Sequence, residues 1–159
     1  TVIAYVDPVS SPAIIPKEMY LKTGFEIAKR TISKIKGPTV MHLASGRCLH
    51  ILREIEQTGT SMIAACAFVD LAEIKTVCDG RLAIIGNLNN IEMRHWTPKQ
   101  TEAYVRDAIA RAGAGGGYIL SDTHGEIPCQ VPEDVLMTIS EAVHTWGNYP
   151  LDWAKDYGK

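Results

Sequence analysis

The fold is decided by residues 82–120, which read LAIIGNLNNIEMRHWTPKQTEAYVRDAIARAGAGGGYIL. A short aliphatic run, residues 82–85, opens this stretch, and a second one, residues 117–120, closes it. Between them Thr97 and Pro98 predict the start of a helix, with Thr as the N-cap and Pro at the first helical position. We expect that helix to continue into the glycine cluster at residues 113–117, which forms a turn. The order of strand, helix and strand predicts a parallel βαβ unit.

The same alternation extends over the rest of the chain. Aliphatic runs that predict strands precede this unit at residues 2–6, 39–43 and 62–68. Further helices are expected at residues 17–35, 47–58, 71–77 and 132–146. Because the strand runs are aliphatic nearly throughout, we expect strands buried on both faces of a parallel sheet. An open doubly wound sheet and part of a TIM-type (β/α)8 barrel both satisfy this order. No Gly-x-Gly-x-x-Gly or P-loop pattern follows a strand, so the nucleotide-binding version of the open sheet is not supported.

Composition narrows the class of protein. The 159 residues predict a single α/β domain over residues 1–159, and 46% hydrophobic residues suffice for a core. With 16 Lys and Arg against 18 Asp and Glu, the net charge of −2 offers no general attraction for nucleic acid or an anionic membrane. The 4 cysteines form no Cys-x-x-Cys pair, which favours reduced core thiols. We therefore expect a cytoplasmic protein that binds neither nucleic acid nor a membrane.

Candidate functional residues follow from the predicted strand ends. In both architectures ligands bind at the carboxyl ends of the parallel strands. The side chains at or just after these ends are Asp7, His42, Asp70, Asn87, Asp122, His124 and Glu126. A lone histidine is usually a buried core residue, but two at equivalent strand ends favour function. We therefore take His42 and His124 as candidate catalytic residues and Asp7, Asn87 and Asp122 as candidate substrate-binding residues. His50, His95 and His144 fall in helical or connecting segments and are disfavoured.

These strand ends also resemble a known family. The resemblance lies in Gly86-Asn87 after the fourth strand, Thr97-Pro98 at a helix start, residues 118–128 (YILSDTHGEIP) and residues 131–135 (VPEDV). Together these segments are similar to the uroporphyrinogen decarboxylase superfamily. Residues 7–12 (DPVSSP) and 40–42 (VMH) look more like its cobalamin-dependent branch, the methylcobamide:coenzyme M methyltransferases. The resemblance covers nearly the whole chain but only the last five strands of that family's barrel. It implies a TIM-type (β/α)8 barrel of which this chain supplies the C-terminal five βα units.

The resemblance also implies a function. It is that of a methyltransferase moving a methyl group between a corrinoid (methylcobamide) partner protein and a small acceptor such as a thiol or tetrahydrofolate. In that branch zinc is held by a His-x-Cys after one strand and a Cys after the last. His42 matches the histidine, Ala44 or Ser45 stands where the first cysteine belongs, and His124 stands where the last belongs. A zinc site here would therefore use His42, His124 and Glu126.

Other interpretations stay open on the same residues. Cys129 is a conceivable substitute zinc ligand, although we expect a buried thiol there. Without zinc, the two histidines could orient a pterin or another polar acceptor, with Asp7 and Asn87 hydrogen-bonding its amide edge.

Two further functions are compatible with the sequence. Uroporphyrinogen decarboxylase itself is favoured by His124, which matches the histidine of the decarboxylase Gly-His-Gly-type loop. It is disfavoured because the early strands that hold the porphyrinogen are absent. A non-catalytic fragment or assembly subunit is the third, because five strands cannot close an eight-stranded barrel. The expected partner is then the missing N-terminal barrel half or a second copy of the chain.

Overall fold

The computed structural model describes residues 1–44, 46–122 and 125–157. Five parallel strands form one sheet in chain order: β1 (Ile3–Val6), β2 (Thr39–His42), β3 (Met62–Ala64), β4 (Ala83–Leu88) and β5 (Tyr118–Asp122). Every neighbouring pair runs parallel. A doubly wound sheet reverses its strand order at a switch point, whereas a barrel wall continues in one direction. The uninterrupted order therefore identifies five strands of a TIM-type barrel.

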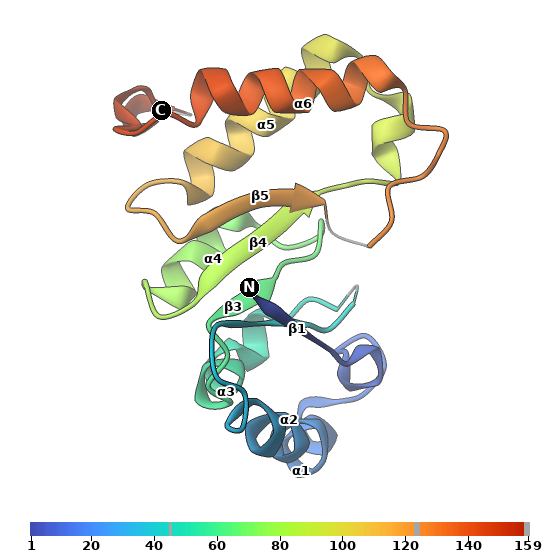
Figure 1. Cartoon of the computed structure of the whole chain (residues 1–159), viewed down its shortest axis with the longest axis vertical. Coiled ribbons are helices and arrows are strands. Elements are labelled where there is room, and N and C mark those ends of the chain that lie inside the picture. The colour runs from blue at the N-terminus through green and yellow to red at the C-terminus, as the bar shows by residue number, and fades with distance from the viewer. Residues whose placement is uncertain (45, 123–124, 158–159) are drawn as a thin grey trace.

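Helices connect and follow these strands. They are α1 (Lys17–Lys22), α2 (Gly24–Ile32), α3 (Leu52–Gln57), α4 (Leu71–Cys78), α5 (Pro98–Ala112) and α6 (Glu133–Trp146). Four short 3-10 helices complete the described elements: η1 (Pro8–Ser10), η2 (Leu49–Ile51), η3 (Glu92–His95) and η4 (Asp152–Asp156). Helices α1 to α3 lie at one end of the sheet and α5 and α6 at the other (Figure 1).

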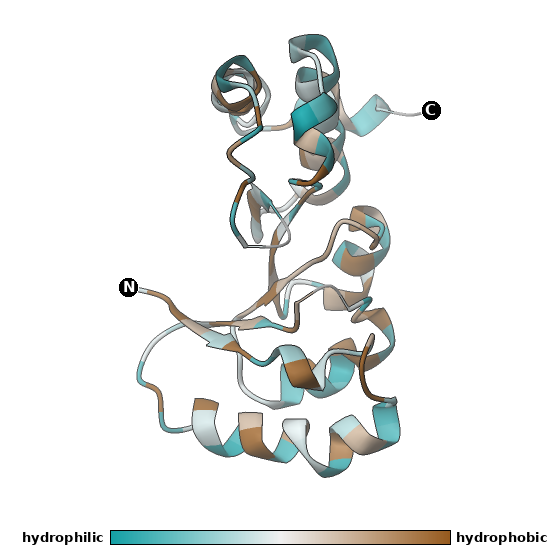
Figure 2. Ribbon diagram, turned by 90° about the vertical axis from the view of Figure 1, so that its right-hand side faces the viewer, coloured by the Kyte–Doolittle hydropathy of each residue, from teal (hydrophilic) through white to brown (hydrophobic). Residues whose placement is uncertain are grey.

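Only one face of the sheet is fully buried. Met41, Ile63 and Ile84 are paired in register across β2, β3 and β4, and none of them is exposed to solvent. On β1 and β5, by contrast, Val6 is 60% exposed and Ile119 is 48% exposed. Figure 2 shows the hydrophobic residues of β1 next to the N-terminus. The expectation of strands buried on both faces is therefore wrong for the two outer strands, because none of the described residues covers these side chains.

Two segments differ from their predicted lengths. The helix expected over residues 17–35 is divided into α1 and α2 at Thr23, whose φ of −127° and ψ of −83° lie outside the helical region. The strand expected over residues 62–68 ends at Ala64. Ala65 and Cys66 beyond it are as buried as a core strand, which explains why their sequence looks like one.

The four cysteines differ in their exposure to solvent. Cys48, Cys66 and Cys78 are buried free thiols, as expected, whereas Cys129 is exposed. The expectation of a buried Cys129 is wrong because this residue lies in the surface loop between β5 and α6. Among the helices of the described residues, none is long and apolar enough to cross a lipid bilayer.

Candidate functional site

Asp7 and His42 lie side by side at the carboxyl ends of β1 and β2. Val6 pairs with His42 in the parallel register, and the backbone N–H of Asp7 donates to the His42 carbonyl at 3.0 Å. The Asp7 carboxylate accepts a hydrogen bond from the backbone N–H of Ser10 at 3.2 Å and so caps η1. Both side chains are half-buried. Two of the polar residues predicted for the rim are thus adjacent.

The hydrogen bond at the His42 ring indicates which of its two nitrogen atoms bears the proton. Its Nδ1 accepts a hydrogen bond from the backbone N–H of Ala44 at 3.3 Å. A ring nitrogen that accepts a hydrogen bond has no proton of its own, so the neutral ring carries its proton on Nε2. A metal-bound histidine has the opposite arrangement: one nitrogen binds the metal and the other donates its N–H. His42 is therefore arranged to donate a hydrogen bond through Nε2.

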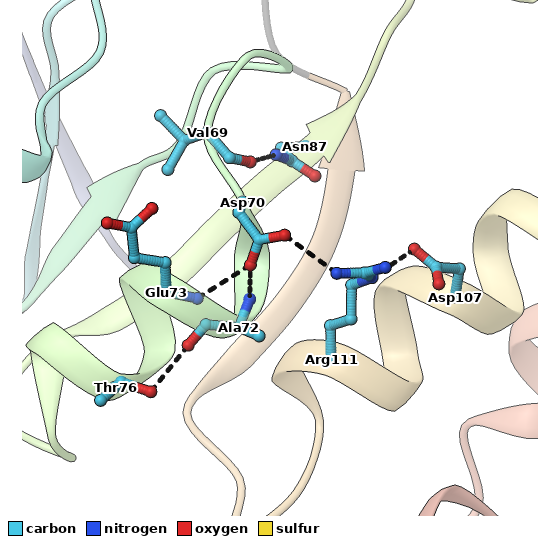
Figure 3. Close-up of polar contacts among 8 residues, drawn as sticks. All are labelled: Val69, Asp70, Ala72, Glu73, Thr76, Asn87, Asp107 and Arg111. Carbon is cyan, nitrogen blue, oxygen red and sulfur yellow. Dashed lines mark hydrogen bonds and ion pairs between the residues drawn. The ribbon is translucent and has the colours of Figure 1, made fainter. Parts of the chain in front are cut away.

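The strand end at Gly86-Asn87 is built around close backbone contact. Gly86 has a φ of +138°, and a Cβ at this position would lie 2.6 Å from the Ala65 carbonyl oxygen. Asn87 donates from Nδ2 to the carbonyl oxygens of Cys66 at 3.0 Å and Val69 at 2.9 Å. Figure 3 shows the second of these bonds. Because both amide hydrogens hold the β3–α4 loop, only Oδ1 of Asn87 is left for a ligand.

One buried oxygen atom at the end of β5 and one shortly after β4 have no partner among the described residues. Asp122 Oδ2 and Asn90 Oδ1 are buried and have no hydrogen-bond partner in the part of the chain that the structure describes. Asn90 is 1% exposed, and its Nδ2 donates to the Glu126 carbonyl oxygen at 3.0 Å. Asn90 thus fixes the backbone of the β5–α6 loop. Glu126 itself is exposed.

The predicted zinc site is only partly visible. His124 and Ser45 lie outside the described residues, so the expected pairing of His42 with His124 stays a prediction. Within residues 1–44, 46–122 and 125–157, no three His, Cys, Asp or Glu side chains are grouped to hold a metal. His42 and Glu126 alone are too few ligands for zinc, and the hydrogen bond from Ala44 occupies Nδ1 of His42. The described residues therefore support no chemical step through zinc.

A cavity of about 690 Å³ lies beyond the ends of β3 and β4. Its walls come from the β3–α4 loop, the β4–α5 segment and one side of α5. Asp70 and Asn87 line it, as do residues that the sequence analysis did not single out, among them Glu92, Trp96 and Tyr104.

An ion-pair chain joins two walls of this cavity (Figure 3). Asp70 caps α4 by accepting from the backbone N–H groups of Ala72 and Glu73, both at 2.9 Å. Its second oxygen lies 2.9 Å from Arg111 Nη1, and Arg111 Nε lies 2.7 Å from Asp107 Oδ2. The hydrogen bond that Arg111 donates to the Asp107 carboxylate is the largest cause that raises the pKa of Arg111. Asp70 therefore positions α4 against α5.

His95 and Trp96 were missed as site residues by the sequence analysis. Both line the cavity, yet they lie between β4 and α5 in a segment without a strong pattern. The available signal was length: residues 89–97 connect a strand to a helix where 2–6 residues are usual. Longer connections of this kind often carry function.

Comparison with known proteins agrees with the barrel geometry. The family model described as uroporphyrinogen decarboxylase (URO-D) matches residues 1–146. A solved methyltransferase from Methanosarcina mazei superposes with a TM-score of 0.80 at 19% sequence identity. The superposition covers 92% of this chain and 42% of that one, so the chain spans about two-fifths of its length. Among curated proteins none matches the sequence. At this identity the superposition shows a common fold.

Proposed function

Since the chain belongs to the uroporphyrinogen decarboxylase family, we propose that it forms part of an enzyme that transfers a methyl group between a corrinoid protein and a small acceptor. The observation that carries the proposal is the position of His42 at a strand end whose backbone is hydrogen-bonded to that of Asp7, in a sheet that superposes on a methyltransferase. Ligands of parallel α/β barrels bind at this rim.

The arrangement of His42 favours an acceptor held by hydrogen bonds. Ala44 offers a backbone N–H to the ring where the family pattern has a cysteine. The Nε2–H that results can donate to an amide or carbonyl oxygen. The amide edge of a pterin such as tetrahydrofolate offers such an oxygen, and a thiol is the second acceptor. The corrinoid would supply the methyl group and would keep the electron pair of the cobalt–carbon bond. The acceptor's lone pair would form the new bond to the methyl carbon, and the acceptor's proton would be released.

The test is demethylation of methylcobalamin followed by its visible absorbance. We expect conversion with tetrahydrofolate or with a thiol, and at least about a tenfold loss of rate in His42→Ala. The matched control is His50→Ala, an exposed histidine at the end of η2, which should leave the rate unchanged. No conversion with either acceptor would contradict the proposal.

Zinc bound by His42, His124 and Glu126 stays a separate prediction. For zinc to bind, His42 has to lose the hydrogen bond from the Ala44 backbone N–H and bind the metal through one ring nitrogen. Metal analysis of the purified protein and of His42→Ala tests it. Zinc in the wild type that is lost in the variant supports these ligands, and protein without zinc refutes them.

Uroporphyrinogen decarboxylation is the second candidate, because the matching family model carries that description. Release of carbon dioxide from uroporphyrinogen by the purified protein would favour it over methyl transfer. We expect no release, since the early strands of the family barrel that hold the porphyrinogen are not in this chain.

We also propose that the outer strands β1 and β5 pair with strands outside this chain. The methyltransferase on which the chain superposes is more than twice as long, and Val6 and Ile119 are exposed apolar residues on these outer strands. A missing N-terminal barrel half fits the geometry best, and a second copy is the alternative. Analytical ultracentrifugation of the isolated chain separates them: a stable dimer favours the second copy. A monomer that pairs with an added N-terminal half favours the first.

A further inference from the structure

The cavity beyond β3 and β4 combines aromatic rings with carboxylates. Trp96 and Tyr104 both line it, with ring centroids 4.5 Å apart and planes inclined by 38°. Trp96 is half-buried and Tyr104 is 46% exposed, so the pair keeps surface open to the cavity. A volume of about 690 Å³ is enough for a small molecule. The walls therefore offer both space and an aromatic surface.

The charges that line the cavity are mainly negative. Three carboxylates, Asp70, Glu92 and Asp107, line it against one guanidinium, Arg111. Arg111 is already held between Asp70 and Asp107. Glu92 is exposed and its carboxylate has no partner in the part of the chain that the structure describes. One carboxylate in the same cavity as the two aromatic rings is thus free to pair with a ligand.

The nearest other basic side chain is directed at a neighbouring ring. His95 lines the cavity, and its Nε2 accepts a hydrogen bond from Arg94 Nε at 3.1 Å. Arg94 does not itself line the cavity.

We propose that this cavity is a second binding site, distinct from the strand-end pair of Asp7 and His42, and that it takes an organic ammonium ion. The ammonium group would lie against Trp96 and Tyr104 by cation–π attraction and pair with Glu92. Aromatic rings together with one carboxylate favour a poorly hydrated organic cation over a metal ion, which requires several oxygen ligands.

The test uses tetramethylammonium as the cation and tert-butanol as its uncharged counterpart of similar shape. The readout is the NMR shift of the Trp96 indole N–H, assigned with a Trp96→Phe variant. We expect a saturable shift with tetramethylammonium chloride, none with sodium chloride at equal concentration, and none with tert-butanol. An equal response to tert-butanol would show a merely apolar groove and overturn the proposal, as would a shift that does not saturate.

Variants locate the ion within the cavity. Glu92→Gln removes the charge of an exposed residue, so the fold is retained, and we expect about a fivefold weaker affinity. The matched control is Glu133→Gln in the first turn of α6, which should leave the affinity unchanged. An unchanged affinity in Glu92→Gln would refute the pairing. Because the readout is binding, its outcome is independent of methyl transfer.

Discussion

Burial makes the Cys48 thiol less acidic than a thiol exposed to solvent. Desolvation raises its pKa to about 12 from an ordinary value of 9.0, and the same cause raises the pKa of Cys78 to about 11. The folded protein therefore keeps both thiols protonated in a range where the unfolded chain ionises them.

The first prediction is a loss of stability at alkaline pH. Because the folded pKa values lie above 9.0, the unfolded state binds fewer protons above that pH, and the free energy of unfolding falls as pH rises. Urea unfolding at pH 8 and pH 9.5 should show this fall, and Cys48→Ala should show less of it. Cys129→Ala removes an exposed thiol and serves as the control. A slope that is identical in Cys48→Ala and the wild type would refute the assignment.

The second prediction concerns Asn87. Removing its amide leaves the Val69 carbonyl oxygen without this donor, whereas the Cys66 carbonyl oxygen keeps the hydrogen bond from the Val69 backbone N–H. We expect Asn87→Ala to lower the free energy of unfolding by about 1–3 kcal/mol, the cost of buried groups left unpaired. Asn148→Ala, which removes one exposed amide hydrogen bond, should cost about 0.5 kcal/mol or less. Equal effects of the two variants would show that Asn87 does not hold the loop.

The start of α5 depends on one reciprocal pair of hydrogen bonds. Thr97 Oγ1 accepts from the Gln100 backbone N–H at 3.4 Å, and Gln100 Oε1 accepts from the Thr97 backbone N–H at 2.9 Å. The third prediction is that Thr97→Ala lowers the free energy of unfolding by about 0.5–2 kcal/mol. Thermal unfolding measures this loss, and the control is Thr145→Ala, which removes an exposed side chain of α6. An equal loss of stability in Thr145→Ala and Thr97→Ala would contradict a capping role for Thr97.

The C-terminal 3-10 helix η4 is attached through Arg106 of α5. The Arg106 Cζ lies 4.3 Å from the Trp146 ring centroid, 5.4 Å from that of Trp153 and 5.2 Å from that of Tyr157. The fourth prediction is that Arg106→Ala frees η4, so that limited proteolysis cuts near residues 152–156 sooner than in the wild type. Arg94→Ala, an exposed arginine, is the control. Unchanged cleavage in Arg106→Ala would show that another contact attaches this segment.

Elements whose limits are set locally were predictable from the sequence. Thr97 and Pro98 place the start of α5 correctly because capping depends on neighbouring residues. The break at Thr23 is marked only by Gly24 directly after it, and a single glycine inside a helical pattern does not by itself predict a break. The end of β3 was missed because Ala65 and Cys66 remain buried after the strand has ended, so burial and strand pairing no longer coincide.

At the scale of the whole molecule, the sheet is an incomplete barrel wall. Val6 and Ile119 present apolar side chains on the two outer strands. The fifth prediction is that an added N-terminal barrel half associates with the chain through these strands, and that Val6→Lys together with Ile119→Lys weakens this association. Sedimentation velocity measures this, and circular dichroism shows that the variant is folded. Association that persists in a folded double variant would place the contact elsewhere.

The candidate site was predictable where the topology alone brings residues together. Asp7 and His42 follow adjacent parallel strands, and their proximity needs only the correct strand order. The cavity residues His95 and Trp96 could not be placed, since their position depends on how a long connection folds against α5. The hydrogen bond from Ala44 to His42 could not be predicted either, because it depends on a left-handed backbone at Ala44 with a φ of 55°.

The rate of methylcobalamin demethylation in the presence of tetrahydrofolate or a thiol tests the proposed enzyme most directly. We expect acceptor-dependent conversion by the wild type, with a rate that falls at least about tenfold in His42→Ala and is unchanged in His50→Ala. Equal rates in the wild type and His42→Ala, or no conversion at all, would contradict a role for the β1–β2 strand ends in methyl transfer.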